Sequence, residues 1–223
     1  MNNIDLRNSE AEHATNIDAQ PLPEQKPSKL TQIVDALRYI FIALIVVIPI
    51  RAYIAQPFIV QGNSMYPTLH NHEYLIVNET VKLTQDYRRG DVVILHYPND
   101  PSRYFVKRII GLPGETVNFE GTVVTITGPT HPKPLVLNEP YVADSQKMNN
   151  HLTRTLSNDE FFVCGDNRSQ SSDSRIWGPV PRNYMDGRAL IRLFPFSVVG
   201  FNPGSLAEFG SPYPAELAPK STN

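Results

Sequence analysis

The sequence predicts a mostly β protein, with an N-terminal transmembrane helix followed by an open antiparallel β-barrel or packed antiparallel sheets. Three observations lead to this prediction: one long apolar stretch near the N-terminus, short runs of β-branched and aromatic residues after it, and 20 prolines among 223 residues. Prolines interrupt helices and suit short strands that are joined by turns. Hydrophobic residues make up 41% of the chain, which is enough to build a core.

Both ends of the chain are polar. Residues 1–35 mix charges of both signs with three prolines, and residues 202–223 contain four prolines among small and polar residues. Segments of this composition bury too little apolar surface to fold. We therefore expect a disordered cytoplasmic arm over residues 1–35 and a flexible tail over residues 202–223.

Residues 36–55, with the sequence ALRYIFIALIVVIPIRAYIA, form the one strongly apolar stretch. A helix of about twenty residues spans about 30 Å, which is the thickness of the hydrocarbon core of a bilayer. The uninterrupted apolar part, residues 39–50, is shorter than this. We therefore expect Arg38 and Arg51 to reach toward the two interfaces, beside Tyr39 and Tyr53.

Two other interpretations of residues 36–55 are weaker. A buried core helix would show a polar face, which residues 39–50 lack. A cleaved signal peptide would place bulky Tyr53 where the cleavage site needs a small residue. The stretch therefore predicts an uncleaved, single-pass anchor in the cell membrane.

Basic residues predict the orientation of this anchor. Lys26, Lys29 and Arg38 precede it, whereas after Arg51 the next basic residue is Lys82. Because cytoplasmic flanks are enriched in Lys and Arg, we expect the N-terminus in the cytoplasm and the chain from about residue 56 outside it.

The segment from about residue 56 to 201 reads as β structure, because short runs of branched and aromatic residues alternate with turn signals. The expected strands are 74–77, 91–97, 104–110, 116–119, 122–127, 160–164 and 188–194. No long helical periodicity follows the anchor, so antiparallel sheets are the natural architecture.

Composition excludes several classes of function. Lys and Arg number 20 against 22 for Asp and Glu, and this net charge of −2 argues against nucleic-acid binding. A single cysteine, Cys164, excludes an intramolecular disulfide framework and a multi-cysteine zinc site. Because no histidine accompanies Cys164, we expect a buried apolar residue there rather than a nucleophile. His70 and His72 lack clear further ligands, so we expect them at the surface and no metal site.

Ser64 lies in the first segment with candidate chemistry, GNSMYPTL at residues 62–69. The glycine and asparagine before Ser64 and the proline after it suggest a tight turn that presents the hydroxyl. A serine that caps its own backbone is the alternative. A Ser-His-Asp hydrolase elbow would need glycine where Tyr66 stands.

Lys107 lies in the second segment, on a predicted strand. Alternation along a strand places it on one face between Phe105 and Ile109. Burial among apolar residues lowers the pKa of a lysine, and a neutral amine can act as a general base. A lysine that protects an edge strand is the alternative. Arg108 points to the opposite face, where we expect it to reach solvent at an edge.

The third segment, CGDNRSQSSDSR at residues 164–175, is a polar loop after an apolar strand. It lacks the spacing of an EF-hand calcium loop. Asp173 and Arg175, two residues apart in an extended segment, would share a face and form an ion pair.

Together, these segments resemble the bacterial type I signal peptidases, the Ser-Lys membrane proteases that remove signal peptides from exported proteins. The resemblance runs from the anchor to about residue 194, with four motifs in order. These are QPF leading into SMYPTL at residues 56–58 and 64–69, RGDVV at 89–93, KRIIGLPG at 107–114, and GDNR through SSDSR at 165–175.

The resemblance implies a role for each matching residue. Ser64 matches the nucleophile and Lys107 the general base, while Ser171 matches the serine that orients the lysine amine. Asp173 and Arg175 match an ion pair that supports the site. The positions that match the walls of the family's shallow pockets, which accept small residues such as Ala-X-Ala, are Phe58, Val60, Met65, Leu69 and Val106.

The resemblance also implies an extracytoplasmic peptidase domain over residues 56–201, with a small β region inserted at about 116–160. No metal or organic cofactor is implied. The implied partners are secretory preproteins with their signal peptides, the lipid bilayer and, nearby, the Sec-type export machinery.

Two positions depart from patterns seen in the family. Gly62 stands where some members place a serine whose hydroxyl helps to stabilise the oxyanion, and Phe105 stands where tyrosine is common.

Two other functions stay open. One is a self-cleaving Ser-Lys protease similar to SOS repressors, against which the anchor argues. The other is a catalytically silent membrane-tethered adaptor, against which the joint presence of Ser64, Lys107 and Ser171 argues.

Overall fold

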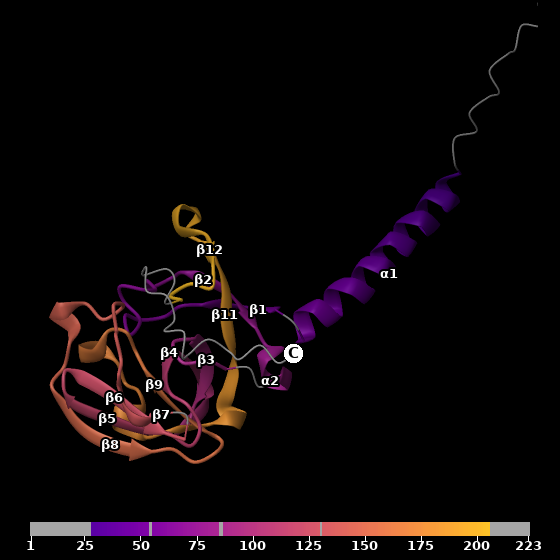
Figure 1. Ribbon diagram of the computed structural model, residues 1–223. Coiled ribbons are helices and arrows are strands. Elements are labelled where there is room, and N and C mark those ends of the chain that lie inside the picture. Colours follow the sequence, from indigo (N-terminus) through magenta and orange to yellow (C-terminus); the bar gives the residue numbers. More distant parts are fainter. Residues whose placement is uncertain (1–27, 54, 85–86, 130, 206–223) are drawn as a thin grey trace, which may run out of the picture. The chain divides into compact units, whose positions relative to one another are not determined.

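The computed structural model describes residues 28–53, 55–84, 87–129 and 131–205 (Figure 1). The chain divides into two compact units between residues 44 and 45. Residues 1–27 of the expected arm and 206–223 of the expected tail lie outside the described residues.

A single long helix, α1 (Lys29–Tyr53), begins the described part of the chain. Ser28 caps it, because its Oγ accepts a hydrogen bond from the Thr31 N–H at 3.2 Å. Residues 29–35, which the composition assigned to the arm, are therefore helical, since this cap extends the apolar helix toward the N-terminus. The segment Lys29–Ile48 has a mean hydropathy of 2.0 and is long enough to cross a membrane. The Arg38 guanidinium lies over the Tyr39 ring at 5.5 Å, and the side chains of residues 51 and 53 lie outside the described residues.

After α1 the regular structure is mostly β. The strands are β1 (Ala55–Ile59), β2 (Tyr74–Asn78), β3 (Val92–Tyr97), β4 (Asp100–Gly111), β5 (Thr116–Gly121), β6 (Val123–Gly128), β7 (His131–Val136), β8 (Asn150–Thr155), β9 (Glu160–Cys164), β10 (Val180–Pro181), β11 (Met185–Phe194) and β12 (Gly200–Phe201). Two four-residue helices, α2 (Val81–Thr84) and α3 (Ser174–Trp177), and four short 3-10 turns complete the described elements.

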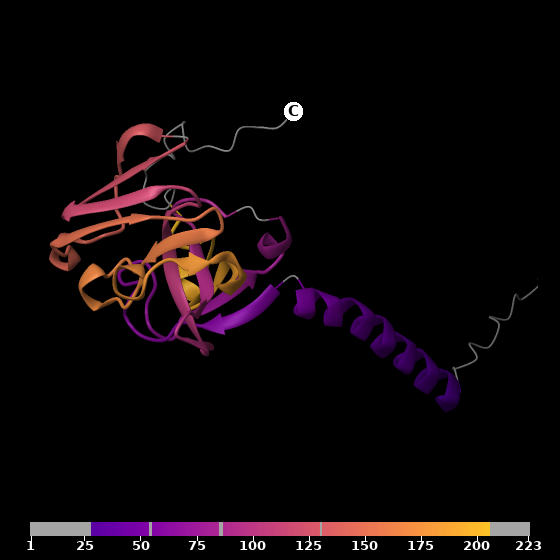
Figure 2. The same ribbon diagram turned by 90° about the horizontal axis from the view of Figure 1, so that it is seen from below.

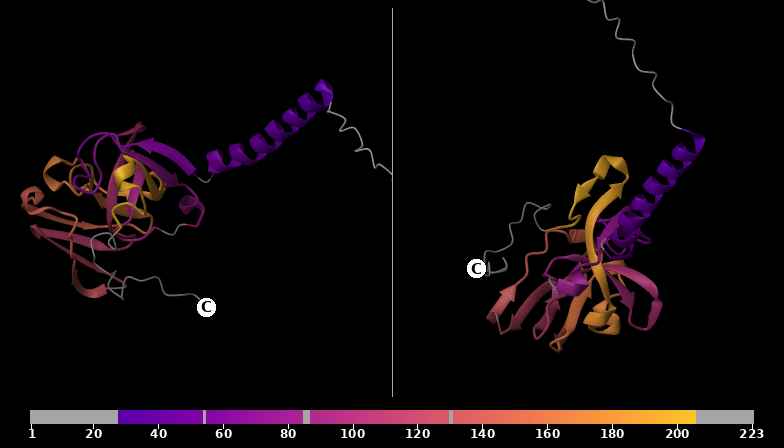
Figure 3. Two further views of the ribbon diagram at one scale, coloured as in Figure 1. Left: turned by 90° about the horizontal axis from the view of Figure 1, so that it is seen from above. Right: turned by 90° about the vertical axis from the view of Figure 1, so that its right-hand side faces the viewer.

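The larger sheet is antiparallel, with the strand order β1-β2-β11-β3-β4-β9-β10, and β12 pairs with β11. The long strand β11 is hydrogen-bonded to β2 on one side and to β3 on the other (Figure 3). The described strands of this sheet do not close into a barrel. The prediction of a mostly β, antiparallel and open domain is confirmed, and packed sheets rather than a barrel describe it.

The smaller sheet has the order β7-β6-β5-β8 and lies between β4 and β9 in the chain (Figures 1 and 2). One shared core joins the two sheets, because Ile110 and Phe162 of the larger sheet pack with Val117 and Phe119 of the smaller one. This is the small inserted β region that the resemblance implied.

Five of the described strands were not predicted from the sequence. β10 and β12 have only two residues each, too few to show a pattern, whereas β1, β7 and β8 were missed for other physical reasons. β7 carries alternate prolines and β8 is mainly polar, and both are edge strands, which tolerate such residues. β1 contains Pro57 and begins at Ala55, inside the predicted anchor; it too lies at a sheet edge.

The chain after β12 stays attached to the larger sheet. Pro203 and Gly204 are buried, and the Gly204 carbonyl accepts a hydrogen bond from Arg108 at 2.5 Å. Residues 202–205, which the composition assigned to the flexible tail, therefore make contacts with the larger sheet, and the Gly204 carbonyl satisfies a buried guanidinium.

Candidate active site

Ser64 and Lys107 meet although 43 positions separate them. Lys107 lies on β4, opposite Val93 of β3, and Ser64 lies in the turn that follows β1. The Lys107 Nζ donates a hydrogen bond to Ser64 Oγ at 2.8 Å and another to the Val106 carbonyl at 3.1 Å. A hydroxyl and an amine at this distance can exchange a proton directly.

Burial changes the acidity of the lysine. Only 3% of Lys107 is exposed, and desolvation lowers the pKa of its amine from 10.5 to about 8, against the opposing charge of Asp173. The aromatic ring of Phe105 lies 5.1 Å from the Nζ and keeps this side apolar. The neutral amine, which can accept a proton, is therefore populated near pH 8.

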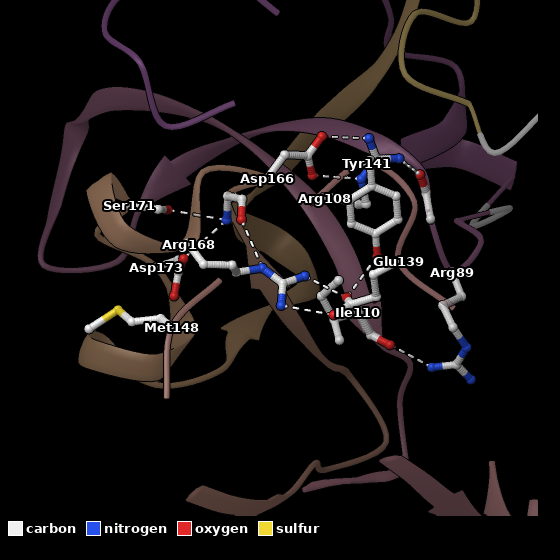
Figure 4. Close-up of polar contacts among 12 residues, drawn as sticks. Arg89, Arg108, Ile110, Glu139, Tyr141, Met148, Asp166, Arg168, Ser171 and Asp173 are labelled. Atoms are coloured by element: carbon white, nitrogen blue, oxygen red, sulfur yellow. Dashed lines mark hydrogen bonds and ion pairs between the residues drawn. The ribbon is translucent and has the colours of Figure 1, made fainter. Parts of the chain in front are cut away.

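Arg108, the next residue on β4, has the opposite environment. It is fully buried, and its guanidinium forms a two-pronged ion pair with Asp166 at 2.7 and 2.6 Å (Figure 4). The Tyr141 ring lies 3.9 Å from the guanidinium carbon. The prediction that Arg108 reaches solvent is wrong, because a carboxylate, two backbone carbonyls (Gly90 and Gly204) and a ring satisfy it inside the protein.

Asp173 and Arg175 form the ion pair expected from the sequence. The Arg175 Nε and Nη2 both donate to the Asp173 carboxylate at 2.8 Å. The geometry differs from the extended segment that was expected: Asp173 caps helix α3 by accepting the Arg175 N–H, and Arg175 lies in the first turn. The pKa of Asp173 is lowered: burial opposes this, but the hydrogen bond and charge of Arg175 outweigh it.

Ser171 lies beside the pair formed by Ser64 and Lys107, called the dyad below, but its hydrogen-bond partners are other residues. Its Oγ accepts the Gly165 N–H at 3.1 Å, and a hydrogen bond from Ser171 helps to lower the pKa of Asp173 (Figure 4). Among the hydrogen bonds of the described residues, none joins Ser171 to Lys107. In this geometry Ser171 is linked to Lys107 through the Asp173 carboxylate, whose charge raises the pKa of the amine.

Gly165 explains why the loop 165–175 can approach Ser64. A Cβ at this position would overlap the Ser171 Oγ and the Ser64 carbonyl oxygen. The absence of a side chain therefore lets three backbone segments converge. The sequence showed this glycine only as the start of a motif, because its neighbours come from distant segments.

A cavity of about 430 Å³ opens in front of the dyad. Of the predicted pocket residues, Phe58, Val60, Met65 and Val106 line it. Leu69 does not line it: this side chain is fully buried in the core behind the cavity, so its predicted pocket role is wrong.

Residues that the sequence did not single out complete the cavity. Tyr104 stands on β4 near Phe58, with ring centroids 5.4 Å apart, and Gln170 and Ser172 reach the cavity from the loop around Ser171. Residues on either side of a motif serine could have been suspected from alternation along an extended chain, since neighbours of a buried residue point outward.

A second cavity of about 530 Å³ lies along the smaller sheet. Its buried ion pair joins Arg168 to Glu139 at 3.0 and 2.5 Å (Figure 4). Neither Ser64 nor Lys107 lines it; both line the smaller of the two cavities.

Cys164 and the two histidines follow the sequence expectations. Cys164 is fully buried, and burial raises the pKa of its thiol well above the usual value, so the thiolate is suppressed. His70 and His72 are exposed, and His70 lies 3.4 Å from Glu73. Within the described parts of residues 28–205, no three His, Cys, Asp or Glu side chains are grouped to hold a metal ion.

The chain is similar to known proteins. The family model described as signal peptidase, peptidase S26, matches residues 33–194. Signal peptidase I of Bacillus amyloliquefaciens is 36% identical over 186 residues, which cover 79% of this chain and 96% of that protein. Signal peptidase I S of Bacillus subtilis strain 168 is 36% identical over 187 residues, covering 79% and 97%. A crystal structure of a signal peptidase I from Enterococcus faecalis V583, 27% identical, aligns with a TM-score of 0.38 over 46% of this chain and 96% of that one.

Proposed function

From the premise that this chain belongs to the peptidase S26 family of signal peptidases, we propose that it cleaves preproteins with Ser64 as the nucleophile and Lys107 as the general base. The protein is a serine protease that removes signal peptides. The observation that carries the assignment is the 2.8 Å hydrogen bond between Lys107 Nζ and Ser64 Oγ, at an amine whose pKa burial lowers to about 8.

The neutral Lys107 amine takes the Ser64 proton as Oγ attacks the scissile carbonyl carbon. The resulting ammonium gives this proton to the leaving amine when the C–N bond breaks, so an acyl-enzyme forms and Lys107 is neutral again. Lys107 then removes a proton from water, whose oxygen attacks the ester. When the ester bond breaks, the proton returns to Ser64 Oγ and the signal peptide leaves with a new carboxylate.

The negative oxygen of the tetrahedral intermediate needs hydrogen-bond donors. The backbone N–H of Ser64 is the first donor, as in other serine proteases in which the nucleophile's own N–H faces the oxyanion. Gly62 has no side-chain hydroxyl to offer, and its N–H donates to Asn71 Oδ1 at 3.0 Å. The Ser64 N–H therefore bears a large share of the stabilisation.

The cavity suits an extended peptide. β1 is a sheet edge, and the ladder from β4 to β9 begins at Arg108, which leaves the described part of β4 before it with a free edge on that side. A preprotein segment can pair with such edges by β-strand addition. Phe58, Val60, Met65 and Val106 then bound shallow pockets that favour small side chains at the cleavage site.

The remaining predicted residues support the dyad. Asp173 places a negative charge near Lys107 and limits how far its pKa falls. Arg175 and Ser171 hold this carboxylate in place. Ser171 thus orients the lysine through Asp173 and Gly165.

The protein is membrane-associated, with an N-terminal apolar helix. In our proposal α1 crosses the bilayer once with the N-terminus in the cytoplasm, and the peptidase domain, from about residue 56 to 201, lies outside. The arm over residues 1–27 stays cytoplasmic. The Sec-type export machinery works nearby, because a preprotein must cross the bilayer before this domain can cut it.

Exposed apolar side chains support contact between the peptidase domain and the bilayer. Ile59, Tyr74 and Phe194 lie side by side across β1, β2 and β11, and all are exposed. Phe196 and Phe201, which follow β11, are 83% and 75% exposed. β1 begins two residues after the end of α1, so the anchor and this apolar surface are close in the sequence.

The test uses detergent-solubilised full-length protein and a preprotein with an Ala-X-Ala site, with products identified by mass. We expect wild type to cut after the second alanine, and Ser64→Ala and Lys107→Ala to be inactive but folded by circular dichroism. The exposed Ser157→Ala and Lys133→Ala are matched controls that should keep full activity. Cleavage by folded Ser64→Ala would refute the dyad.

A further inference from the structure

Asn167 contacts the nucleophile turn twice. It lies in the loop after β9, is 4% exposed, and donates its backbone N–H to the Ser64 carbonyl at 3.0 Å. Its side-chain Nδ2 donates to the Asn63 carbonyl at 3.1 Å. The two acceptors are the carbonyls on either side of the Ser64 Cα.

The second of these contacts reaches the oxyanion donor. The Asn63 carbonyl and the Ser64 N–H belong to the same planar trans peptide, so they point in opposite directions. The Asn63 carbonyl accepts two hydrogen bonds, one from the Tyr66 N–H within the turn at 3.2 Å and one from Asn167 Nδ2, and donors that fix the carbonyl also fix the direction of the N–H. The same bonds polarise the peptide and make the N–H a stronger donor.

Asn167 is itself held firmly. The Ser169 hydroxyl donates to Asn167 Oδ1 at 3.0 Å, which leaves Nδ2 facing the Asn63 carbonyl. On either side in the chain, Asp166 and Arg168 are tied into buried ion pairs with Arg108 and Glu139 (Figure 4). The side-chain amide is thus preorganised and does not have to be ordered during the reaction.

We infer that Asn167 is a positioning residue for the oxyanion site: its side-chain amide aims and polarises the Ser64 N–H, and its backbone N–H holds the Ser64 carbonyl. The inference rests on the proposed dyad and adds a residue to it. Its weight is increased by Gly62, which supplies no hydroxyl, and whose N–H is engaged by Asn71.

A residue with this role acts on the transition state and leaves the base alone. We expect Asn167→Ala to lower kcat by about 10- to 100-fold, below or near the loss seen when an oxyanion donor is removed outright. KM and the pH at which activity rises should stay unchanged, because Lys107 keeps its surroundings. Asn167→Asp, which keeps the size but replaces the Nδ2 donor with an oxygen, should show the same loss of kcat at its own pH plateau. Its added carboxylate, like that of Asp166, should raise the pKa of Lys107.

The experiment compares wild type, Asn167→Ala, Asn167→Asp and the exposed control Asn158→Ala as full-length protein in detergent. Each is titrated with a small-X-small peptide aldehyde, which forms a tetrahedral adduct with the serine, and with the same peptide lacking the aldehyde. We expect aldehyde affinity to fall in the same ratio as kcat, with peptide affinity within about twofold of wild type.

Three results overturn the inference. They are wild-type kcat in both folded Asn167 variants, an equal loss of affinity for aldehyde and plain peptide, and a shifted pH profile of Asn167→Ala, which adds no charge, since each points away from oxyanion orientation. If Asn167→Ala fails to fold, the isosteric Asn167→Asp decides. Failure of the dyad looks different: Ser64→Ala would then cleave like wild type.

Discussion

The pH dependence of cleavage follows from one buried amine. Burial disfavours the charged form of Lys107 and so lowers its pKa from 10.5 to about 8, a difference worth about 3 kcal/mol. Since only the neutral amine can accept the Ser64 proton, kcat/KM should rise with pH and level off above about 8. At pH 7 about one tenth of the lysine is neutral, so activity should be about tenfold below the plateau.

The assay is cleavage of a peptide substrate from pH 6 to 9.5, with substrate groups that do not titrate in this range. We expect a slope of one on the acid side. A flat profile between pH 6 and 9, or activity that falls as pH rises through 8, would refute a lysine base.

The same amine makes a stability prediction for Lys107→Met. Below pH 8 the folded wild type carries a buried charge, so the apolar variant should be more stable by up to about 3 kcal/mol. Between pH 8 and 10.5 the unfolded wild type keeps a proton that the folded protein has lost, so wild-type stability rises and the advantage fades. Denaturant unfolding at pH 7 and 10 measures this; an equal difference at both would contradict the burial argument.

Three further predictions concern the surroundings of the dyad. Asp173→Asn removes a negative charge that raises the pKa of Lys107, so the acid side of the pH profile should move to lower pH; a move to higher pH would contradict the charge assignment. Gly165→Ala forces a methyl group against the nucleophile's carbonyl and should lower kcat on the order of 100-fold, whereas wild-type kinetics would show that the turn can relax. A chain ending at residue 201 lacks the Gly204 carbonyl that accepts from buried Arg108 and should be about 1–3 kcal/mol less stable than one ending at residue 205, measured by denaturant unfolding.

Whether a feature of the site could be predicted from the sequence depends on whether its contacts are local in the chain. Strand alternation placed Lys107 on an apolar face, and this is where it lies, since β4 is a regular strand and its face is decided by period two. The close pair Asp173 and Arg175 was likewise visible. Leu69 was not separable from true pocket residues, because one step along a turn decides whether a side chain faces the cavity or the core.

Contacts between segments that are distant in the chain could not be predicted from the sequence. Nothing near Arg108 in the chain shows that Asp166, 58 positions away, will pair with it, so an exposed position was the reasonable expectation. The partners of the Ser171 hydroxyl could not be predicted either, because they depend on Gly165 packing against the turn that contains Ser64. The strands β7 and β8 were missed for another reason: they lie at the edges of the smaller sheet, and an edge strand needs no continuous apolar pattern.

Lys107 and Arg108 show how one strand can hold a titrating base beside a permanent cation. Both side chains are almost fully buried, so burial alone does not separate them. The difference lies in their partners: Arg108 meets a carboxylate in a two-pronged ion pair, whereas Lys107 meets a neutral hydroxyl, a backbone carbonyl and an aromatic ring. An ion pair compensates the lost hydration of a charge, and neutral partners do so only in part. Because alternation sends neighbouring residues to opposite faces, the fold keeps the Asp166 carboxylate bound to the arginine and leaves the lysine able to lose its proton.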